Sequence, residues 1–328
     1  MPPPRTDDPH AAVLALFERA GVDDTDLRSQ LTCALERVGG AAALSLLLAD
    51  GTSRLGPVAT RTLESFKALG CREVGIAWAR RLDRLRSAHG IAGGPGPVRG
   101  GVVVAGDATY PPNLARAIER PPFLFHRGAL GTLGDRLVAV VGTRRPSPDG
   151  VALARQLTTD LSTRGAVIVS GLALGIDAVA HRACIEAGGI TVGVLGHGIS
   201  SPLYPRCHEE LASAIIGSGG VLISQFWPEQ APDHRSFLSR NVTMAGISLA
   251  TVVVEAGERS GARQQARKSL ELERPVFLPR RLLDAQTWAK EFASRTGVEV
   301  VERPDQILSS IGASITARPQ VPVQLAFA

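Results

Sequence analysis

The sequence predicts an α/β protein with a doubly wound, mostly parallel, Rossmann-like sheet that is preceded by a small helical domain. Short apolar segments alternate with longer amphipathic segments from residue 137 to residue 311. The short segments are apolar on both faces, which is typical of parallel strands that helices cover on both sides. Residues 11–89 instead repeat apolar side chains every three to four positions, which is the period of a helix.

Length and composition limit the class of protein. The chain has 328 residues, of which 44% are hydrophobic and 20% charged, so it is long enough to bury a sizeable core. Its formal net charge of +5 permits a nucleic acid or another polyanion as partner. Aromatic residues make up only 4%, which argues against a wide stacking platform for single strands.

The sequence gives no sign of a membrane or a metal. No apolar run is long enough to span a bilayer and the start lacks a secretion signal, so we expect a cytoplasmic protein with no membrane partner. The four cysteines are scattered without a CxxC pair, which is typical of a reducing compartment. His197 and His208 are too isolated to be metal ligands, so no metal ion is expected.

The chain divides into five regions. Residues 1–10 are proline-rich and charged and are expected to be disordered. Residues 11–89 form the helical domain, in which glycines separate the helical segments. A glycine- and proline-rich linker at 90–101 leads into the Rossmann-like domain at 102–313, and residues 314–328 form a loose tail.

The large domain begins with a connector and then alternates strictly. The connector holds a short strand starting at Val102 and an apolar strand at 123–126, with a short helical piece between them. Strands of the alternating part are expected at 137–141, 166–170, 191–195, 221–224, 251–254, 275–278 and 298–301. Helices are expected at 149–163, 177–187, 207–216, 237–248, 261–273, 285–295 and 304–311.

The first strand of the alternating part predicts a phosphate site. It stops at Gly142 and leads into a loop with Arg144 and Arg145, after which a helix starts near Pro148. This order places backbone N–H groups and a helix N-terminus at one spot, which attracts anions. The two arginines add positive charge, and their planar groups suit phosphate oxygens.

The loops after other strands support the same site. In an open α/β sheet, ligands bind beyond the carboxyl ends of the strands, where the strand order reverses. Four of the predicted loops at this edge combine glycine with a hydroxyl, an arginine or a histidine, the one with His197 and Tyr204 among them. The candidate phosphate-binding residues of the other three loops are Gly142, Thr143, Arg144, Arg145, Ser170, Gly171, Gly175, Asp177, Arg259, Ser260 and Gly261.

Several polar residues near these loops have more than one interpretation. Asp177 either caps its helix or contacts the ligand. His181 follows it by four residues, so a structural hydrogen bond between the two is favoured over proton chemistry. Glu255 and Glu258 could form an acid/base pair, but a surface salt bridge with the adjacent Arg259 is favoured. No catalytic residue is predicted.

Positive charge also collects in segments 233–241 and 259–268. The candidate contact residues there are Arg235, Arg240, Asn241, Arg259, Arg263 and Arg267. The three arginines of the second segment repeat every four residues and would share one helix face. That face is either solvated and balanced by Glu271 and Glu273, or it follows the backbone of a nucleic acid.

Six segments in fixed order resemble the DNA-processing protein A (DprA/Smf) family of bacterial recombination mediators. The segments are PPFLFHRGAL at 121–130, VAVVGTRRPSPDG at 138–150, IVSGLALGIDAVAH at 168–181, VGVLGHG at 192–198, LYPRCHEEL at 203–211 and VVVEAGERSGA at 252–262. The resemblance covers about residues 107–277, roughly half of the chain.

The resemblance implies a function in DNA uptake and recombination. It implies a Rossmann-like domain that binds single-stranded DNA, assists loading of the RecA recombinase and forms a homodimer. It implies no catalytic activity and no required nucleotide cofactor. Carried over by position, the residues that face DNA are Gly142, Thr143, Arg144, Ser170, Gly171, Arg240, Asn241, Ser260 and Gly261.

The chain departs from the family pattern at several charged positions. Ser239 and Val242 stand where the family has arginines, so two expected positive charges are missing. Residues 278–281 place two arginines after a proline where the family has a Val-Pro-Gly turn. Arg263 and Arg267 would offset the missing charges if the path of the DNA is shifted.

Two other classes stay open as alternatives. One is a nucleotide-binding or nucleotide-hydrolysing enzyme similar to the lonely-guy phosphoribohydrolases, although residues 255–262 lack the glycine doublet of those enzymes. The other is a nucleotide-sensing module that signals through the helical domain. A dinucleotide oxidoreductase is the least favoured class, because the first strand lacks a G-x-G-x-x-G turn.

Overall fold

The computed structural model describes the sheet domain almost completely and the N-terminal region in part. The described residues are 8–20, 32–33, 35–36, 39–41, 71–87, 100–117, 119–130, 133–303, 305–307 and 309–311. The expected tail at 314–328 lies outside them, as do most of the expected helical domain, residues 1–7 of the expected disordered start and the linker up to residue 99. The expectation of disorder over residues 1–10 is wrong at its end, because Pro9 and His10 begin a helix that runs to Ala20.

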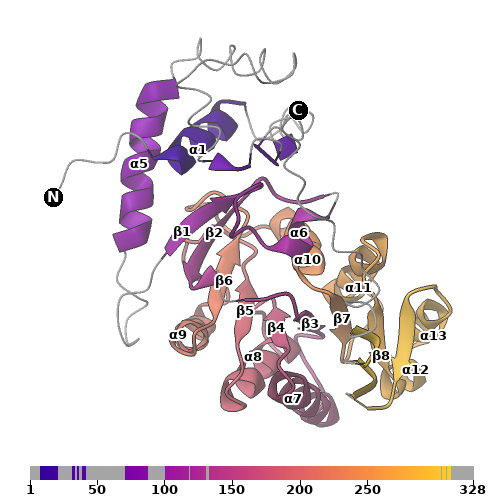
Figure 1. Ribbon diagram of the computed structural model, residues 1–328. Helices are drawn as coiled ribbons and strands as arrows, with labels where there is room; N and C mark the ends of the chain where they lie inside the picture. The colour runs from indigo at the N-terminus through magenta and orange to yellow at the C-terminus, as the bar shows by residue number, and fades with distance from the viewer. Residues whose placement is uncertain are drawn as a thin grey trace.

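Nine strands form one sheet (Figure 1). They are β1 (Gly100–Val104), β2 (Phe123–Gly128), β3 (Leu137–Val141), β4 (Val167–Ser170), β5 (Thr191–Val194), β6 (Val221–Ser224), β7 (Ala250–Val253), β8 (Val276–Pro279) and β9 (Val298–Val301). Their order is β1-β2-β6-β5-β4-β3-β7-β8-β9. The strands from β6 to β9 in this order pair in parallel, and β2 pairs antiparallel with both β1 and β6. The predicted doubly wound, mostly parallel sheet is confirmed.

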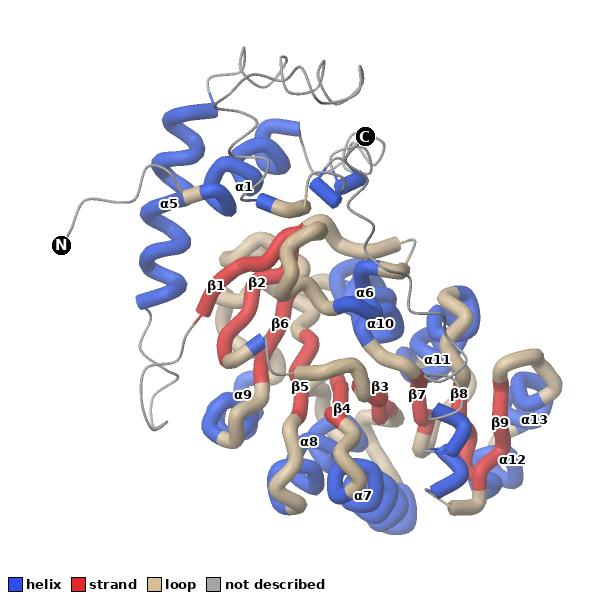
Figure 2. The backbone as a smooth tube through the Cα atoms, viewed as in Figure 1, coloured by secondary structure: helices blue, strands red, loops and turns tan. Residues whose placement is uncertain are grey.

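The helices follow the predicted alternation. They are α1 (Pro9–Ala20), α5 (Cys71–Ser87), α6 (Pro112–Ala115), α7 (Pro148–Thr163), α8 (Ile176–Glu186), α9 (Glu209–Gly217), α10 (His234–Ile247), α11 (Gly261–Glu271), α12 (Arg280–Ala285) and α13 (Thr287–Ala293). None of the helices described is long and apolar enough to cross a membrane. Figure 2 shows the row of strands with α7, α8 and α9 on one side and α10 and α11 on the other.

Several bounds differ from the expectation, as at α10, which begins at His234 rather than at 237 because Asp233 caps it. The expected linker end at Gly100 and Gly101 belongs to β1. The expected helix at 285–295 is α13 and runs only over Thr287–Ala293, because Gln286 has extended backbone angles and separates it from α12. The sequence pattern missed α12, which starts directly after Pro279 and buries Leu282 and Leu283 against the sheet.

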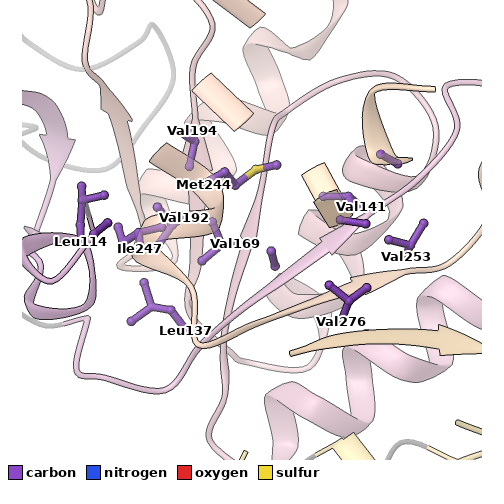
Figure 3. Close-up of a cluster of buried hydrophobic side chains, with 14 of the residues drawn as sticks. Leu114, Leu137, Val141, Val169, Val192, Val194, Met244, Ile247, Val253 and Val276 are labelled. Carbon is purple, nitrogen blue, oxygen red and sulfur yellow. The ribbon is translucent and has the colours of Figure 1, made fainter. Parts of the chain in front are cut away.

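Alternating side chains of the central strand bind the two helical layers to the sheet. Leu137 and Val141 of β3 lie in one buried cluster with Met244 of α10 (Figure 3). Val138 and Val140 point to the opposite face and pack in a second cluster that includes residues of α7 and α8. A strand buried on both faces has no polar side, so the apolar run LVAVV identified it from sequence.

The described N-terminal helices share a core with the edge of the sheet. Phe17 of α1 and Trp78 of α5 are in one buried cluster with Phe123 and Phe125 of β2. The ring centroids of Trp78 and Phe125 are 6.3 Å apart, and those of Trp78 and Trp227 are 5.1 Å apart. These helices are therefore packed onto the sheet edge through aromatic side chains.

Candidate functional site

The strand order reverses beside β3, and a cavity opens at that point. The chain runs from β3 outward through β4, β5 and β6 and then returns to add β7 on the other side of β3. The loops after β3, β4 and β7 therefore meet at one edge of the sheet, where ligands bind in open α/β folds. A cavity of about 820 Å³ lies there, between these loops and the helices α10 and α11.

The structure brings many of the predicted site residues together at this cavity. The predicted residues that line it are Gly142, Thr143, Arg144, Asp177, Arg240, Asn241, Arg259, Ser260 and Gly261. The predicted residues outside its lining are Arg145, Ser170, Gly171, Gly175, Arg235, Arg263 and Arg267.

Two glycines let the three loops pack backbone to backbone. The Thr143 N–H donates to the Glu255 carbonyl at 2.6 Å, and the Ile176 N–H donates to the Thr143 carbonyl at 3.1 Å. A Cβ on Gly142 would lie 2.9 Å from the Glu255 carbonyl oxygen. A Cβ on Gly175, whose φ is +78°, would lie 2.3 Å from the Thr143 oxygen. These positions therefore require glycine for close approach, and this accounts for them without a ligand.

The N-terminus of α7 is already occupied, which corrects the prediction that it faces a phosphate. The Glu255 carboxylate accepts hydrogen bonds from the Ser147 hydroxyl at 2.8 Å and from the Ser147 N–H at 3.2 Å. A Cβ on Gly150 would lie only 1.9 Å from the Glu255 Oε2 atom. The chain thus supplies its own anion to this helix end, from the loop after β7.

Glu255 and Glu258 do not form an acid/base pair. Glu255 is held by Ser147, while Glu258 forms an ion pair with Arg263. The favoured salt bridge with Arg259 is also wrong, because the partner of Glu258 is Arg263. The guanidinium of Arg263 lies 5.5 Å from the centre of the Trp288 ring, so this arginine is directed away from the cavity.

Asp177 and Arg240 are buried and shape the loop after β4. Asp177 accepts hydrogen bonds from the N–H groups of Gly171 at 3.0 Å and Ala173 at 3.4 Å. Arg240 donates to the Val194 carbonyl at 3.0 Å. Burial raises the pKa of the Asp177 carboxyl, and the positive charge of Arg240 opposes this rise. Both side chains belong to the floor of the cavity rather than to its open rim.

The predicted hydrogen bond between Asp177 and His181 is wrong. The His181 Nδ1 atom lies 2.7 Å from the Thr191 hydroxyl, which itself donates to the Ile168 carbonyl at 2.9 Å. Since the hydroxyl proton is used, Nδ1–H of the ring is the donor. Burial lowers the pKa of His181 to about 3, so the ring is a neutral core group. Asp177 faces the loop, whereas His181 faces the sheet.

Other predicted contacts are directed elsewhere. The Ser170 hydroxyl is fully buried and donates to the Val140 carbonyl at 2.7 Å, so it is out of reach of a ligand. Asn241 is buried and donates to the Gly261 carbonyl at 3.4 Å, which ties α10 to the start of α11. Ser260 is the N-cap of α11, so Arg259 precedes the helix and does not belong to the predicted arginine stripe.

The site also contains aromatic residues that were not predicted. Tyr204 follows β5 and Phe237 lies in α10, and both line the cavity with ring centroids 5.6 Å apart. The guanidinium of Arg144 lies 5.8 Å from the centre of the Phe237 ring. The low aromatic content hid this cluster, although Tyr204 stands in a loop at the carboxyl edge of the predicted sheet.

Across the described part of the chain, no group of three or more His, Cys, Asp or Glu side chains is placed to hold a metal ion. The carboxylates that line the cavity, Asp177 and Asp233, both accept hydrogen bonds from backbone N–H groups. The arrangement therefore favours binding of an anion over acid/base chemistry.

A family model described as DNA recombination-mediator protein A matches residues 101–312. The chain is 36% identical over 222 residues to Protein Smf of Escherichia coli (strain K12), a match that covers 67% of this chain and 59% of that protein. It is 39% identical over 184 residues to the putative DNA processing protein DprA of Mycobacterium tuberculosis (strain H37Rv), covering 56% of this chain and 47% of that protein. The matches thus span about half of these relatives.

Solved structures share the fold. The X-ray structure of DNA processing protein A from Streptococcus pneumoniae aligns with a TM-score of 0.58 at 25% identity and covers 92% of both chains. The protein of that name from Helicobacter pylori, whose structure concerns its single-stranded DNA binding mode, aligns with a TM-score of 0.56 at 24% identity. That alignment covers 62% of this chain and 94% of the Helicobacter chain.

Proposed function

Because the chain belongs to the DNA recombination-mediator protein A family, we propose that it binds single-stranded DNA in the cavity at the switch point. The observation that carries the proposal is a pair of exposed arginines on separate loops of one cavity. Arg144 follows β3 and Arg259 follows β7, and both side chains line the cavity. Within the described residues, neither forms an ion pair with a carboxylate.

The two arginines suit a polyanion better than a single phosphate. They come from different strands of the sheet, so they offer separate positions to successive phosphates of a strand. Contacts of this type carry little sequence information and weaken strongly with salt. The related Helicobacter protein, whose structure concerns single-stranded DNA binding, has the same fold.

The closed N-terminus of α7 argues against a free nucleotide as the ligand. Rossmann-type folds bind the phosphates of nucleotides at the N-terminus of the helix after the first strand. Here the Glu255 carboxylate accepts the Ser147 hydrogen bonds at that position and would repel a phosphate. This favours the DNA-binding function over the nucleotide-hydrolysing and nucleotide-sensing alternatives.

The wider role is recombination. We propose that the protein is a non-catalytic mediator that forms a homodimer and presents the bound strand to the RecA recombinase. The support is the family membership together with a cavity whose lining carboxylates are both held by backbone N–H groups. The rate at which RecA assembles on a single strand, with and without the protein, measures this role.

A competition assay tests the DNA-binding function. The full chain is titrated against a fluorescent single-stranded oligonucleotide, and mononucleotides or duplex are added at equal phosphate concentration. We expect the unlabelled single strand to compete best, and the logarithm of the binding constant to fall linearly with the logarithm of the salt concentration. Equal competition by a mononucleotide would instead favour a nucleotide enzyme or sensor.

A further inference from the structure

Exposed apolar side chains gather at the mouth of the cavity. In the described residues, the large hydrophobic side chains with high exposure are Leu174 at 44%, Tyr204 at 48% and Leu238 at 37%. Tyr204 and Leu238 line the cavity, and Leu174 directly follows Ala173, which also lines it. Exposed apolar groups that cluster at one place mark a binding surface.

The backbone of Tyr204 is held in place while its ring stays half exposed. The Tyr204 N–H donates to the Nε2 atom of His197, which is buried, at 3.3 Å. The Tyr204 ring contacts Phe237 at an interplanar angle of 49°. Phe237 also contacts the Arg144 guanidinium, so the tyrosine and the arginine flank the same ring. A flat apolar surface and a cation therefore lie close together.

We propose that Tyr204 is a stacking platform for a nucleobase, with Leu174 and Leu238 as its apolar surroundings. This inference rests on the proposed binding of single-stranded DNA. A nucleotide unit of a single strand carries a flat apolar base beside a phosphate, which matches an exposed ring beside Arg144 and Arg259. Stacking on an aromatic ring tolerates any base, because every base has a π face.

A stacking platform at Tyr204 would also give the site a preference for single-stranded over duplex DNA. In a duplex the base faces are stacked on one another, so Tyr204 has no face to contact. The phosphate contacts of Arg144 are available from either form of DNA. Discrimination against duplex therefore comes from the apolar side chains at the cavity mouth rather than from the arginines.

The occupant is assigned as a base, rather than an apolar side chain of a second protein, because of the charges nearby. Arg144 and Arg259 line the same cavity, and neither has a carboxylate partner in the described residues. A protein contact would have to place acidic and apolar groups side by side, whereas a nucleic acid strand repeats this combination at every unit.

Substitution of Tyr204 combined with a strand that lacks bases gives a direct test. We expect Tyr204→Ala to weaken binding of an oligothymidylate about tenfold. Tyr204→Leu, which keeps apolar bulk against Phe237, is expected to weaken it similarly, and Tyr204→Phe to restore most of the affinity. The salt dependence stays unchanged because no charge is removed. For an oligonucleotide of abasic sites, Tyr204→Ala and the wild type should bind equally.

Three results would overturn the proposal. The first is an equal loss of affinity for abasic and normal strands, since the ring would then act without bases. The second is a Tyr204→Ala variant that binds DNA as the wild type does but has a different oligomeric state. This result would assign the apolar cluster to contact with a second copy of the chain. The third is an unchanged affinity of Tyr204→Leu for oligothymidylate, provided that a circular dichroism spectrum shows this variant to be folded. Failure of the proposed function itself is distinct, because the wild type would then bind neither strand.

Discussion

The β1–β2 edge of the sheet and the switch point beside β3 use charge and aromatic side chains in opposite ways. At the edge formed by β1 and β2, polar groups pair with one another, as His10 does with Asp107 at 2.9 Å and Arg81 with Glu229 at 3.0 Å. At the switch point, Arg144 and Arg259 lack such partners in the described residues, and Tyr204 remains 48% exposed.

The difference separates structural from functional side chains of the same type. Trp78 is buried among other aromatic rings and Arg81 lies over it at 4.7 Å from the ring centre, so both are satisfied within the chain. The cavity shows the same combination of arginine and ring, but with exposed surface left over. Unpaired cations and exposed rings at one place indicate a ligand, whereas paired ones indicate packing.

The largest expected effect tests the structural edge. Trp78→Ala removes a ring that is 2% exposed and packs against Phe125 and Trp227, so it should lower the free energy of unfolding by about 3–5 kcal/mol. Chemical denaturation measures this loss. The folded fraction should bind single-stranded DNA as the wild type does. If the folded variant binds DNA more weakly, the aromatic cluster around Trp78 is not purely structural.

The second prediction concerns pH at the same edge. Burial alone would lower the pKa of His10, but the carboxylates of Asp107 and Asp8 outweigh it and raise the pKa to about 9. A group whose pKa is higher in the folded than in the unfolded protein stabilises the folded state. This contribution is fully present below the pKa of the unfolded protein and is lost as the pH rises through the pKa of the folded protein. The stabilisation is therefore complete below about pH 6.5 and lost towards pH 9.

A pKa raised from 6.5 to about 9 corresponds to a stabilisation on the order of 3 kcal/mol. The free energy of unfolding, measured from pH 6 to pH 9.5, should fall in the wild type by about this much relative to His10→Gln. Parallel pH profiles of the two proteins would show that His10 does not hold α1 to the sheet.

The third prediction concerns the switch point. Arg144→Ala together with Arg259→Ala should lower affinity for a single strand roughly tenfold at moderate salt and reduce the salt slope by about two. Stability should change by less than about 0.5 kcal/mol, since both side chains are exposed. Binding isotherms over a salt series measure both quantities.

A matched double variant sharpens this result. Arg263→Ala with Arg267→Ala removes the same charge from α11, outside the cavity lining. Arg263 pairs with Glu258, so we expect less than about a twofold change in affinity. If this variant loses as much affinity for single-stranded DNA as the variant of the cavity pair does, the result would support a DNA path that is shifted onto α11.

The sequence by itself determined the sheet and the edge at which the site lies. The bounds expected for β3, β6 and β9 agree with the structure. The first two are buried runs of mostly apolar residues, whereas β9 places Glu299 among three valines and is only partly buried. The loops at the carboxyl edge could be placed from strand and helix alternation alone. The strand bounds and the loop positions depend on the apolar pattern within each segment, which can be read without knowing the contacts to distant segments.

Only the tertiary structure decided which polar groups remain for a ligand. Glu255 occupies the end of a helix that begins 107 residues earlier in the chain, and its bond to Ser147 spans 108 positions. His181 is bonded to Thr191 of a neighbouring strand rather than to Asp177. Whether a charged or polar side chain is free depends on partners that are distant in sequence. A local pattern fixes which face is apolar, whereas the pairing of polar groups is fixed only when the loops come together.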